Sequence, residues 1–335
     1  MTTLRRVFAV SLGDPAGIGP EIIARAWTQR VQADLPPFCV IGGAGVLAAA
    51  ATACGLDVPV RAVASLAEAA DIFETHLPVF GTMDEPFTAG HPSQHGAKLA
   101  LASLEGATQL ALGGEVPAMI TAPVSKTQLA DIGFEHAGQT EYLAHSCAVP
   151  PGDAVMMLAG PQLRAIPLTV HCALADVAGM ITTDRIVHRA TIADAALRRD
   201  FGIKHPHIAI AGLNPHAGEN GAFGKEEIDH IAPAIAALQS AGICASGPHP
   251  ADALFAPHAR PGYDAALCMY HDQALIPVKA LDFDKGVNVT LGLPIIRTSP
   301  DHGTAFDIAG QGVANAGAMI AAIQMAGACA ARRNG

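Results

Sequence analysis

Aromatic and charged side chains are both scarce in this 335-residue chain, at 4% and 15% of its residues, while hydrophobic residues make up 50%. That composition excludes global disorder, which combines low hydrophobicity with high net charge. Long apolar runs are also missing, because Gly, Pro or a charge interrupts each stretch before it reaches the length of a bilayer span. The formal charge is −10, and no basic run is available to neutralise phosphates. We therefore expect neither a nucleic-acid partner nor a membrane partner.

Closely spaced cysteines are absent as well, because the seven cysteines are scattered and no Cys-x-x-Cys motif occurs. Neither a thiolate zinc site nor a dithiol redox pair is expected. The apolar stretch after Arg5 and Arg6 is too short for a signal peptide and runs into Gly13-Asp14-Pro15, which predicts a first β-strand. The expected compartment is the cytoplasm, where the thiols stay reduced.

Apolar, strand-like runs alternate with alanine-rich stretches of helical periodicity along almost the whole chain. The expected strands are Val7–Leu12, Phe38–Ile41, Ala118–Thr121, Ala154–Leu158, Leu163–Val170, His207–Ala211 and Ala265–Tyr270. The expected helices are Glu21–Trp27, Ala97–Leu112, Asp184–Asp200, Ile228–Ala241 and Ala316–Ala331. This alternation predicts an α/β fold with much parallel sheet, and the length allows two domains with separate cores. Two stretches rich in Gly and Pro, Gly81–Pro92 and Ala245–Pro261, are predicted to be long loops.

Three histidines each stand where a strand-like run ends: His171, His216 and His271. Ligands of open α/β folds bind beyond the carboxyl ends of the strands, and neutral imidazoles are good ligands for divalent metals. Taken singly, a histidine at such a position is more often a helix cap, a loop contact or a satisfied core group. The occurrence of three favours a metal centre, although their wide separation in sequence fixes no local geometry.

A glycine-rich segment, Ser11-Leu-Gly-Asp-Pro-Ala-Gly-Ile-Gly-Pro-Glu21, follows the first expected strand and opens a helix. Gly17 and Gly19 permit a tight turn there, and Glu21 complements the positive end of the helix. The alternative is a simple strand-to-helix connection. A second segment, Gly42-Gly-Ala-Gly45, lacks the full Gly-x-Gly-x-x-Gly spacing and an acidic partner, so no Rossmann site is assigned to it.

Isolated polar residues in otherwise apolar surroundings are candidates for an anion clamp. Lys126 follows one expected strand, and Lys279, Asn288 and Arg297 punctuate a later apolar segment. Such groups bind carboxylates or phosphates, while solvated charges at strand edges are an equally good explanation on local grounds.

Several motifs together resemble the 4-hydroxythreonine-4-phosphate dehydrogenase family of the pyridoxine pathway. The motifs are Gly13-Asp-Pro-Ala-Gly-Ile-Gly-Pro-Glu21, Gly212-Leu-Asn-Pro-His-Ala-Gly-Glu219, Gly247-Pro-His-Pro-Ala-Asp-Ala-Leu-Phe255, Tyr270-His-Asp-Gln273 and Asp301-His-Gly-Thr-Ala-Phe-Asp-Ile-Ala-Gly310. They occur in the family's order and span nearly the whole chain. The first and last, with the continuation Gly310-Gln-Gly-Val-Ala-Asn315, are also similar to isopropylmalate and isocitrate dehydrogenases.

The resemblance implies a two-domain α/β fold of the isocitrate/isopropylmalate dehydrogenase type, with the active site in the interdomain cleft of a homodimer. One domain would comprise residues 1–130 plus 295–335, on the cofactor side. Residues 131–294 would form the other, with the metal site and the dimer interface. The family's ligands for a divalent metal (Zn, Mg, Mn or Co) fall on His171, His216 and His271. The one matching His271 comes from the neighbouring subunit in the family, so both copies would build each active site.

The same resemblance assigns the substrate and the cofactor. Family contacts to a small anionic hydroxy acid fall on Gln139, Thr140, Lys279, Asn288 and Arg297. NAD would lie along the last motif, at Asp301, His302, Gly303, Thr304, Asp307, Gly310 and Asn315. The implied reaction oxidises 4-phosphohydroxy-L-threonine to a β-keto acid that loses carbon dioxide, with the metal stabilising the developing negative charge. Lys279 is the expected acid–base residue.

One position departs from the family pattern, because Gln139 stands where the family usually has histidine in Gly-His-Thr-Glu. A histidine can carry charge toward a phosphate, whereas glutamine offers a neutral donor, and charge-assisted hydrogen bonds are roughly twice as strong as neutral ones. His136 is a possible compensation. Paralogues that oxidise a cis-dihydrodiol carboxylate, such as terephthalate dihydrodiol, or a sugar-acid phosphate are therefore the main alternative. A non-catalytic metal-binding protein and a phosphate-handling transferase using Lys126 and Arg297 are further alternatives, and neither would need NAD.

Overall fold

The computed structural model describes residues 6–333, which divide into two compact units. Among the described residues, unit 1 comprises residues 6–151 and Leu293–Ala331, and unit 2 comprises Gly152–Gly292 with Arg332 and Arg333. Residues 131–151 thus belong to unit 1. The first segment of this unit ends at residue 151, whereas the resemblance suggested an end at residue 130. Among residues 6–333, no helix is both long and apolar enough to cross a lipid bilayer.

Unit 1 contains a parallel sheet whose described strands are ordered β3-β4-β2-β1-β5-β12. The strands are β1 (Phe8–Ser11), β2 (Phe38–Ile41), β3 (Val60–Val63), β4 (Leu77–Phe80), β5 (Met119–Thr121) and β12 (Arg297–Pro300). The helices are α1 (Gly19–Thr28), α2 (Ala44–Ala53), α3 (Leu66–Ile72), α4 (Gln94–Leu112), α5 (Lys126–Ala130), α6 (Gln139–Ser146) and α12 (Gly317–Arg333).

The central strands of unit 1 are short, continuous apolar runs. Every residue of β1 and β2 is buried, as expected for parallel strands covered on both faces. These strands and β5 confirm the sequence predictions. The edge strand β3 was not predicted, because Arg61 and Ala62 are exposed and leave no apolar run to recognise.

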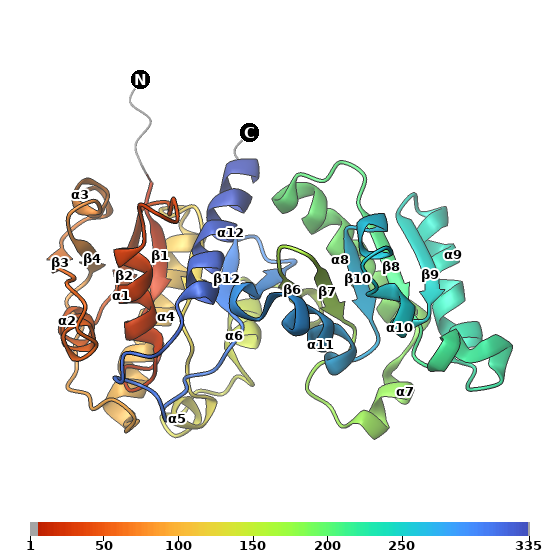
Figure 1. Cartoon of the computed structure of the whole chain (residues 1–335), viewed down its shortest axis with the longest axis horizontal. Coiled ribbons are helices and arrows are strands. Elements are labelled where there is room, and N and C mark those ends of the chain that lie inside the picture. The colour runs from red at the N-terminus through yellow and green to blue at the C-terminus, as the bar shows by residue number, and fades with distance from the viewer. Residues whose placement is uncertain (1–5, 334–335) are drawn as a thin grey trace. The chain divides into compact units, whose positions relative to one another are not determined.

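The chain returns to unit 1 at its C-terminal end. Figure 1 shows α12, in dark blue, in the same unit as the red β1 and α1. Thr298 Oγ1 in β12 donates a hydrogen bond to the Ala322 carbonyl at 2.8 Å, and Gln324 Nε2 donates to the Ala33 carbonyl at 2.6 Å. Unit 1 is therefore closed by two distant segments of the chain.

Unit 2 has a mixed sheet, with its described strands ordered β11-β6-β7-β10-β8-β9. The strands are β6 (Val155–Ala159), β7 (Arg164–Pro167), β8 (His207–Ala211), β9 (Cys244–His249), β10 (Ala265–Cys268) and β11 (Val287–Leu291). The helices are α7 (Val177–Met180), α8 (Thr183–Phe201), α9 (Ala232–Ser240), α10 (Ala251–Leu254) and α11 (His271–Asp282). Strand β6 pairs antiparallel with β11 and β7, whereas β7, β10, β8 and β9 run parallel.

The predicted long loop Ala245–Pro261 is wrong, because this stretch contains most of β9 and all of α10. Its glycine and prolines suggested a loop, but β9 lies at the edge of the sheet, where a residue without an N–H donor is tolerated. The other predicted loop, Gly81–Pro92, is confirmed, since it contains neither a helix nor a strand.

Candidate functional site

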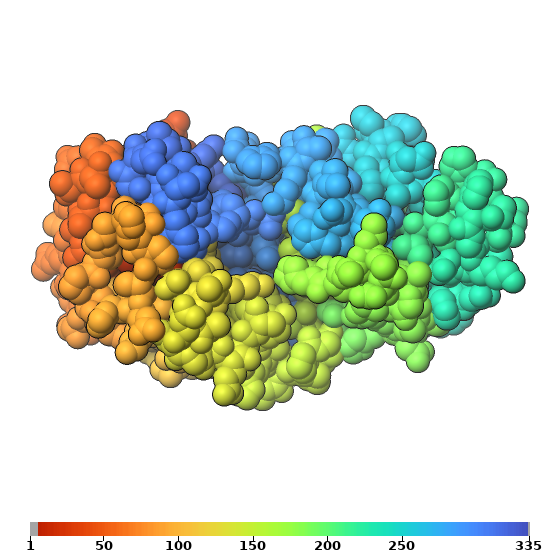
Figure 2. Space-filling model, turned by 90° about the horizontal axis from the view of Figure 1, so that it is seen from below, coloured from red at the N-terminus to blue at the C-terminus, as the bar shows by residue number. Residues whose placement is uncertain are grey.

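Two of the three predicted histidines meet at adjacent strand ends in unit 2. Strands β7 and β10 are parallel neighbours, and their pairing continues past Leu168, whose N–H donates to the Cys268 carbonyl at 2.7 Å. Because both strands end at the same edge of the sheet, the rings of His171 and His271 lie side by side, with 5.9 Å between their centroids. Both line a pocket of about 420 Å³. Figure 2 shows the segment after His171, in yellow-green, beside the blue α11 that begins at His271.

The third histidine, His216, lies on a strained turn that follows β8. Residues 216–220 all have positive φ angles between 41° and 81°, and only Gly218 among them is a glycine, so the backbone is in the left-handed region that other residues rarely adopt. The buried Glu227 carboxylate holds the start of this turn, because its Oε1 accepts hydrogen bonds from the N–H groups of Leu213 and Asn214, both at 2.8 Å. Sequence reasoning missed Glu227, which lies in a π-helical turn at residues 227–231.

Carboxylates orient two of these histidines. His216 Nδ1 donates to Glu219 Oε1 at 2.6 Å, and His271 Nδ1 donates to Asp272 Oδ1 at 2.7 Å. In each ring Nε2 then remains as the lone-pair donor, the arrangement found where a carboxylate orients a metal-binding histidine. The donor chemistry therefore fits a divalent ion. Within residues 6–333 of one chain, however, no group of three or more His, Cys, Asp or Glu side chains is placed to hold one.

A buried glutamine that the sequence analysis did not single out ties the strand ends together. Gln273 Oε1 accepts from the Met269 N–H at 2.6 Å, and its Nε2 donates to the Gly212 carbonyl at 2.8 Å. It thereby connects the end of β10 with the end of β8 and fixes the first turn of α11, where His271 lies. The Tyr270-His-Asp-Gln273 motif contains the only sequence signal for this role.

Lys279 and Asn288, the predicted substrate residues of unit 2, lie on α11 and β11. Lys279 is eight residues after His271, so the two side chains leave the helix within about 80° of each other and about 12 Å apart along its axis. Asn288 Oδ1 is buried and has no hydrogen-bond partner among the described residues. Because a buried polar atom is normally paired, Asn288 is well suited to receive a donor from a ligand.

Arg297, the predicted anion-binding residue of unit 1, is a buried guanidinium at the first position of β12. Its Nη2 donates to Thr121 Oγ1 at 2.7 Å and to Gln139 Oε1 at 3.2 Å. Burial lowers the pKa of Arg297 to about 10, and the negative charge of Glu141 acts in the opposite direction. The guanidinium therefore stays charged at neutral pH. The structure thus joins Arg297 to Gln139, two predicted residues 158 positions apart.

Gln139 and Thr140 begin helix α6, directly after Gly138. No side chain caps this helix start at Gly138, so its first N–H groups are suited to an anion. A Cβ atom built on Gly138 would lie 3.4 Å from Lys126 Nζ, which places that ammonium beside the same turn. Gln139 Nε2 donates to the Ala122 carbonyl at 3.2 Å, so both ends of its amide are engaged.

The glycine-rich segment and the predicted cofactor loop meet in unit 1. The Ile18 N–H donates to the Thr304 carbonyl at 2.9 Å, and a Cβ atom at Gly17 would lie only 2.8 Å from that oxygen. Only glycine allows this approach. A pocket of about 210 Å³ lies against the contact, bounded by residues that include Pro15, Glu21 and Gly310.

Residues 301–316, the predicted cofactor loop, contain neither a helix nor a strand. Asn315 Oδ1 accepts from the Gly317 N–H at 2.8 Å, so this side chain supports the start of α12. The six other predicted cofactor residues precede it along the same loop: Asp301, His302, Gly303, Thr304, Asp307 and Gly310. A Cβ atom at Gly303 would have no atom within 4 Å, which leaves the backbone open to a ligand.

The second glycine-rich segment, 42–45, has its helix start covered by a carboxylate. Asp84 accepts hydrogen bonds from the N–H groups of Gly45 and Val46 at the beginning of α2. The carboxylate occupies the place that a phosphate takes in a Rossmann site.

Comparison with known proteins gives consistent results. The family described as pyridoxal phosphate biosynthetic protein PdxA matches residues 34–326. A 4-hydroxythreonine-4-phosphate dehydrogenase from Erythrobacter litoralis is 61% identical over 329 residues, 98% of either chain. The crystal structure of a 4-hydroxythreonine-4-phosphate dehydrogenase from Klebsiella pneumoniae matches with a TM-score of 0.84 at 38% identity, over 97% of this chain and 99% of that one. A terephthalate 1,2-cis-dihydrodiol dehydrogenase from Burkholderia xenovorans matches with a TM-score of 0.64 at 30% identity, over 96% and 97%. The predicted α/β fold class is thereby confirmed.

Proposed function

The chain belongs to the family of the pyridoxal phosphate biosynthetic protein PdxA, and we propose that it is a metal-dependent 4-hydroxythreonine-4-phosphate dehydrogenase that uses NAD. The observation that carries the proposal is that the predicted metal ligands lie just beyond strand ends of unit 2, with the His216 ring held by Glu219 and the His271 ring held by Asp272. Lone pairs of neutral imidazoles are the donors that a catalytic divalent ion requires. A cytoplasmic location follows from the proposed pathway.

The residues of unit 2 are proposed to act at the reacting carbon. His171, His216 and His271 would hold the divalent ion, and Asn288 would accept a hydrogen bond from the substrate. Bound metal and NAD supply charge stabilisation and a hydride acceptor, for oxidation of the hydroxyl-bearing carbon and loss of carbon dioxide from the resulting β-keto acid. Lys279, which lies on the same helix as His271, would exchange the proton.

The residues of unit 1 are proposed to bind the anionic end of the substrate and the cofactor. Arg297 carries the buried positive charge, with Gln139 and Thr140 beside it at the start of α6. Lys126 adds a second cation near that turn. NAD is assigned to the loop 301–315, where the Gly17 turn approaches Thr304.

A homodimer with shared active sites is part of the proposal. Two large apolar side chains on the helix that begins at His271 or just after it are exposed, Ile276 at 62% and Phe283 at 76%. Exposed apolar side chains around a functional residue are typical of a protein–protein interface. A second copy that covers them would bring its own His271 to the His171 and His216 of this chain, and so complete the set of three ligands.

The test of the proposed function is NADH formation from 4-phosphohydroxy-L-threonine. Protein loaded with a divalent metal is expected to turn over the substrate. Treatment with a chelator should reduce the rate to background, and added Zn²⁺, Co²⁺, Mn²⁺ or Mg²⁺ should restore it, because chelation removes the charge that stabilises the developing anion. Turnover that survives complete removal of the metal, verified by elemental analysis, would contradict the metal assignment.

The alternative substrate, a cis-dihydrodiol carboxylate, is favoured by one observation: Gln139 accepts a hydrogen bond from Arg297 and carries no charge of its own. We expect Gln139→His to lower KM for the phosphorylated substrate about five- to tenfold, because a charge-assisted bond replaces a neutral one. The gain should be larger at pH 6 than at pH 8, since the added imidazole is charged at the lower pH.

A matched experiment separates the two substrates. Wild type and Gln139→His are each assayed with 4-phosphohydroxy-L-threonine and with terephthalate dihydrodiol, and NADH binding is measured by fluorescence. If both proteins bind NADH but only the dihydrodiol is oxidised, the chain is a dihydrodiol dehydrogenase and the phosphorylated substrate is excluded.

A further inference from the structure

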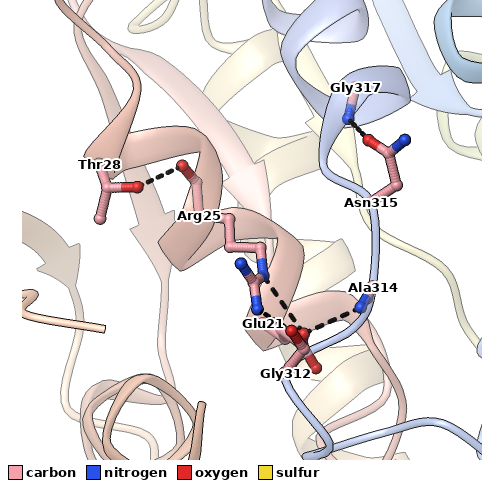
Figure 3. Close-up of polar contacts among 7 residues, drawn as sticks. All are labelled: Glu21, Arg25, Thr28, Gly312, Ala314, Asn315 and Gly317. Atoms are coloured by element: carbon pink, nitrogen blue, oxygen red, sulfur yellow. Dashed lines mark hydrogen bonds and ion pairs between the residues drawn. The ribbon is translucent and has the colours of Figure 1, made fainter. Parts of the chain in front are cut away.

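Two charged residues on successive turns of α1, Glu21 and Arg25, bind the backbone of the proposed cofactor loop. Glu21 Oε1 accepts a hydrogen bond from the Ala314 N–H at 3.1 Å, and Arg25 Nη2 donates to the Gly312 carbonyl. The two side chains also pair with each other, with 3.3 Å between Arg25 Nε and Glu21 Oε1. Figure 3 shows both side chains pointing from α1 toward this segment of the loop. An acceptor and a donor thus bind opposite polar groups of one backbone stretch.

The loop depends on such contacts because it has no regular structure of its own. At its beginning the Thr304 carbonyl accepts from the Ile18 N–H, and at its end Asn315 supports α12. Between these two contacts, Gly310 and Gly312 both have positive φ angles, 75° and 72°. Glycine loses much conformational freedom when it is ordered, so this stretch needs contacts that hold it in place. Glu21 and Arg25 supply side-chain contacts to this middle stretch.

The burial of Glu21 indicates that its contact with the loop has a purpose beyond helix capping. An acidic residue in the first turn stabilises a helix while it remains in water, yet Glu21 is only 1% exposed. Burial of a carboxylate is costly unless a cation and hydrogen-bond donors surround it. Here Arg25 and the Ala314 N–H both contact Oε1, while Oε2 is buried without a hydrogen-bond partner among the described residues. Glu21 Oε1 and Arg25 therefore have these partners only when the loop is in place.

We propose that Glu21 and Arg25 are positioning residues that hold residues 310–315 in the shape that binds NAD. They act on cofactor affinity through the loop and leave the chemical step unchanged. This inference rests on the proposed function, in which the loop 301–315 binds the cofactor. Binding of the cofactor costs less conformational entropy when the loop is already ordered. Removing the contacts of Glu21 and Arg25 should therefore weaken NAD binding.

The thiol of Cys54, which lies where α1 meets the loop, allows an independent measurement. A Cβ atom at Gly312 would lie 3.6 Å from the Cys54 carbonyl, so Cys54 lies next to residues 310–315 of the loop. Burial and the neighbouring Glu21 carboxylate raise the pKa of the Cys54 thiol to about 11. Loss of the Glu21 charge should lower that pKa and open the junction, so that Cys54 reacts faster with iodoacetamide at pH 8.

The test compares Glu21→Gln and Arg25→Gln with Thr28→Ala in the full-length protein. Thr28 lies on the same helix, where its hydroxyl donates only to the Arg25 carbonyl, so Thr28→Ala is the matched control. We expect the first two variants to raise the Kd of NADH and the KM for NAD about tenfold, a change typical of losing a charged hydrogen bond. Their kcat at saturating NAD should stay within about twofold of the wild-type value. Hydrogen exchange at residues 310–316 should be faster, with no change for Thr28→Ala.

The combined variant gives a second criterion. Because the two residues act as one unit, Glu21→Gln with Arg25→Gln should cost no more affinity than either change alone. Unchanged exchange at residues 310–316 in folded variants, or a fall in kcat with KM unaltered, overturns the positioning role. If wild-type protein binds no NADH, the cofactor assignment fails, whereas the exchange data still decide whether the pair holds the loop.

Discussion

Replacing His271 by alanine is expected to lower kcat/KM at least about 10³-fold and to abolish tight binding of the divalent metal. Under the proposed function, the change removes one of three imidazole ligands from a site in which the metal would provide most of the charge stabilisation. His271 is the first residue of α11 and its side-chain hydrogen bond is to its neighbour Asp272, so we expect truncation to leave the rest of the helix intact. Steady-state kinetics, with elemental analysis of the purified protein, measures both effects.

Two control variants make the His271 result specific. Asp272→Asn keeps the imidazole but removes the charge that orients it, and a loss of about 10- to 100-fold is expected, as for other outer partners of metal ligands. His258→Ala removes an exposed histidine of the same unit that lies outside the pocket, and should leave activity within about twofold. Full metal content and activity in His271→Ala would show that this residue is not a ligand.

Mixing two inactive variants tests whether active sites are shared. If each site takes His271 from one copy and Arg297 from the other, a mixed dimer of His271→Ala and Arg297→Met contains one intact site. Random exchange of subunits then restores about a quarter of wild-type activity, because half of the dimers are mixed and half of their sites are intact. No recovery after demonstrated subunit exchange would show that each site takes His271 and Arg297 from the same copy.

The sequence predicted the histidines of the site better than their arrangement. The rule that ligands gather at strand ends singled out His171 and His271, and the structure brings those two together. Their proximity depends on β7 and β10 being neighbours, although Thr169 and Met269 are 100 residues apart. Periodicity describes each strand but not its partner. His216 shows the same limit, since the left-handed turn that carries it has no strand-like or helical pattern.

Supporting contacts were the least visible part of the site. Glu227, Gln273 and Glu21 all act by binding backbone groups of a segment elsewhere in the chain, and Glu21 reaches Ala314 across 293 positions. A motif can flag such a residue, as it does for Glu21, but cannot name the group that it binds. Edge strands were missed for a related reason, because their exposed residues break the apolar run from which a strand is recognised.

Replacing Arg297 by methionine is expected to raise KM for the phosphorylated substrate at least about 100-fold while the protein stays folded. Arg297 is only 4% exposed, so its charge acts on an anion with little screening. Removing the guanidinium also removes the cost of burying its charge. This gain in folding stability offsets the loss of the hydrogen bonds to Thr121 and Gln139. Steady-state kinetics measures KM, and urea unfolding measures the free energy of unfolding. Arg61→Met, at an exposed site on β3, is the matched control. A KM that stays within about threefold of the wild-type value would remove Arg297 from the anion site.

The lysine variant separates charge from shape at the same position. Burial lowers the pKa of Arg297 to about 10, so the charge is largely retained between pH 7 and 9 and the contribution of Arg297 to KM should be nearly flat there. The folded state disfavours this charge, and the resulting loss of stability is relieved only as the pH rises above about 10. Lysine starts from a pKa of about 10.4, and a similar burial lowers it into the assay range. The KM of Arg297→Lys should therefore rise between pH 7 and 9, because neutral lysine no longer attracts the anion. If KM of the lysine variant is high but independent of pH, the forked geometry of the guanidinium, rather than its charge, binds the substrate.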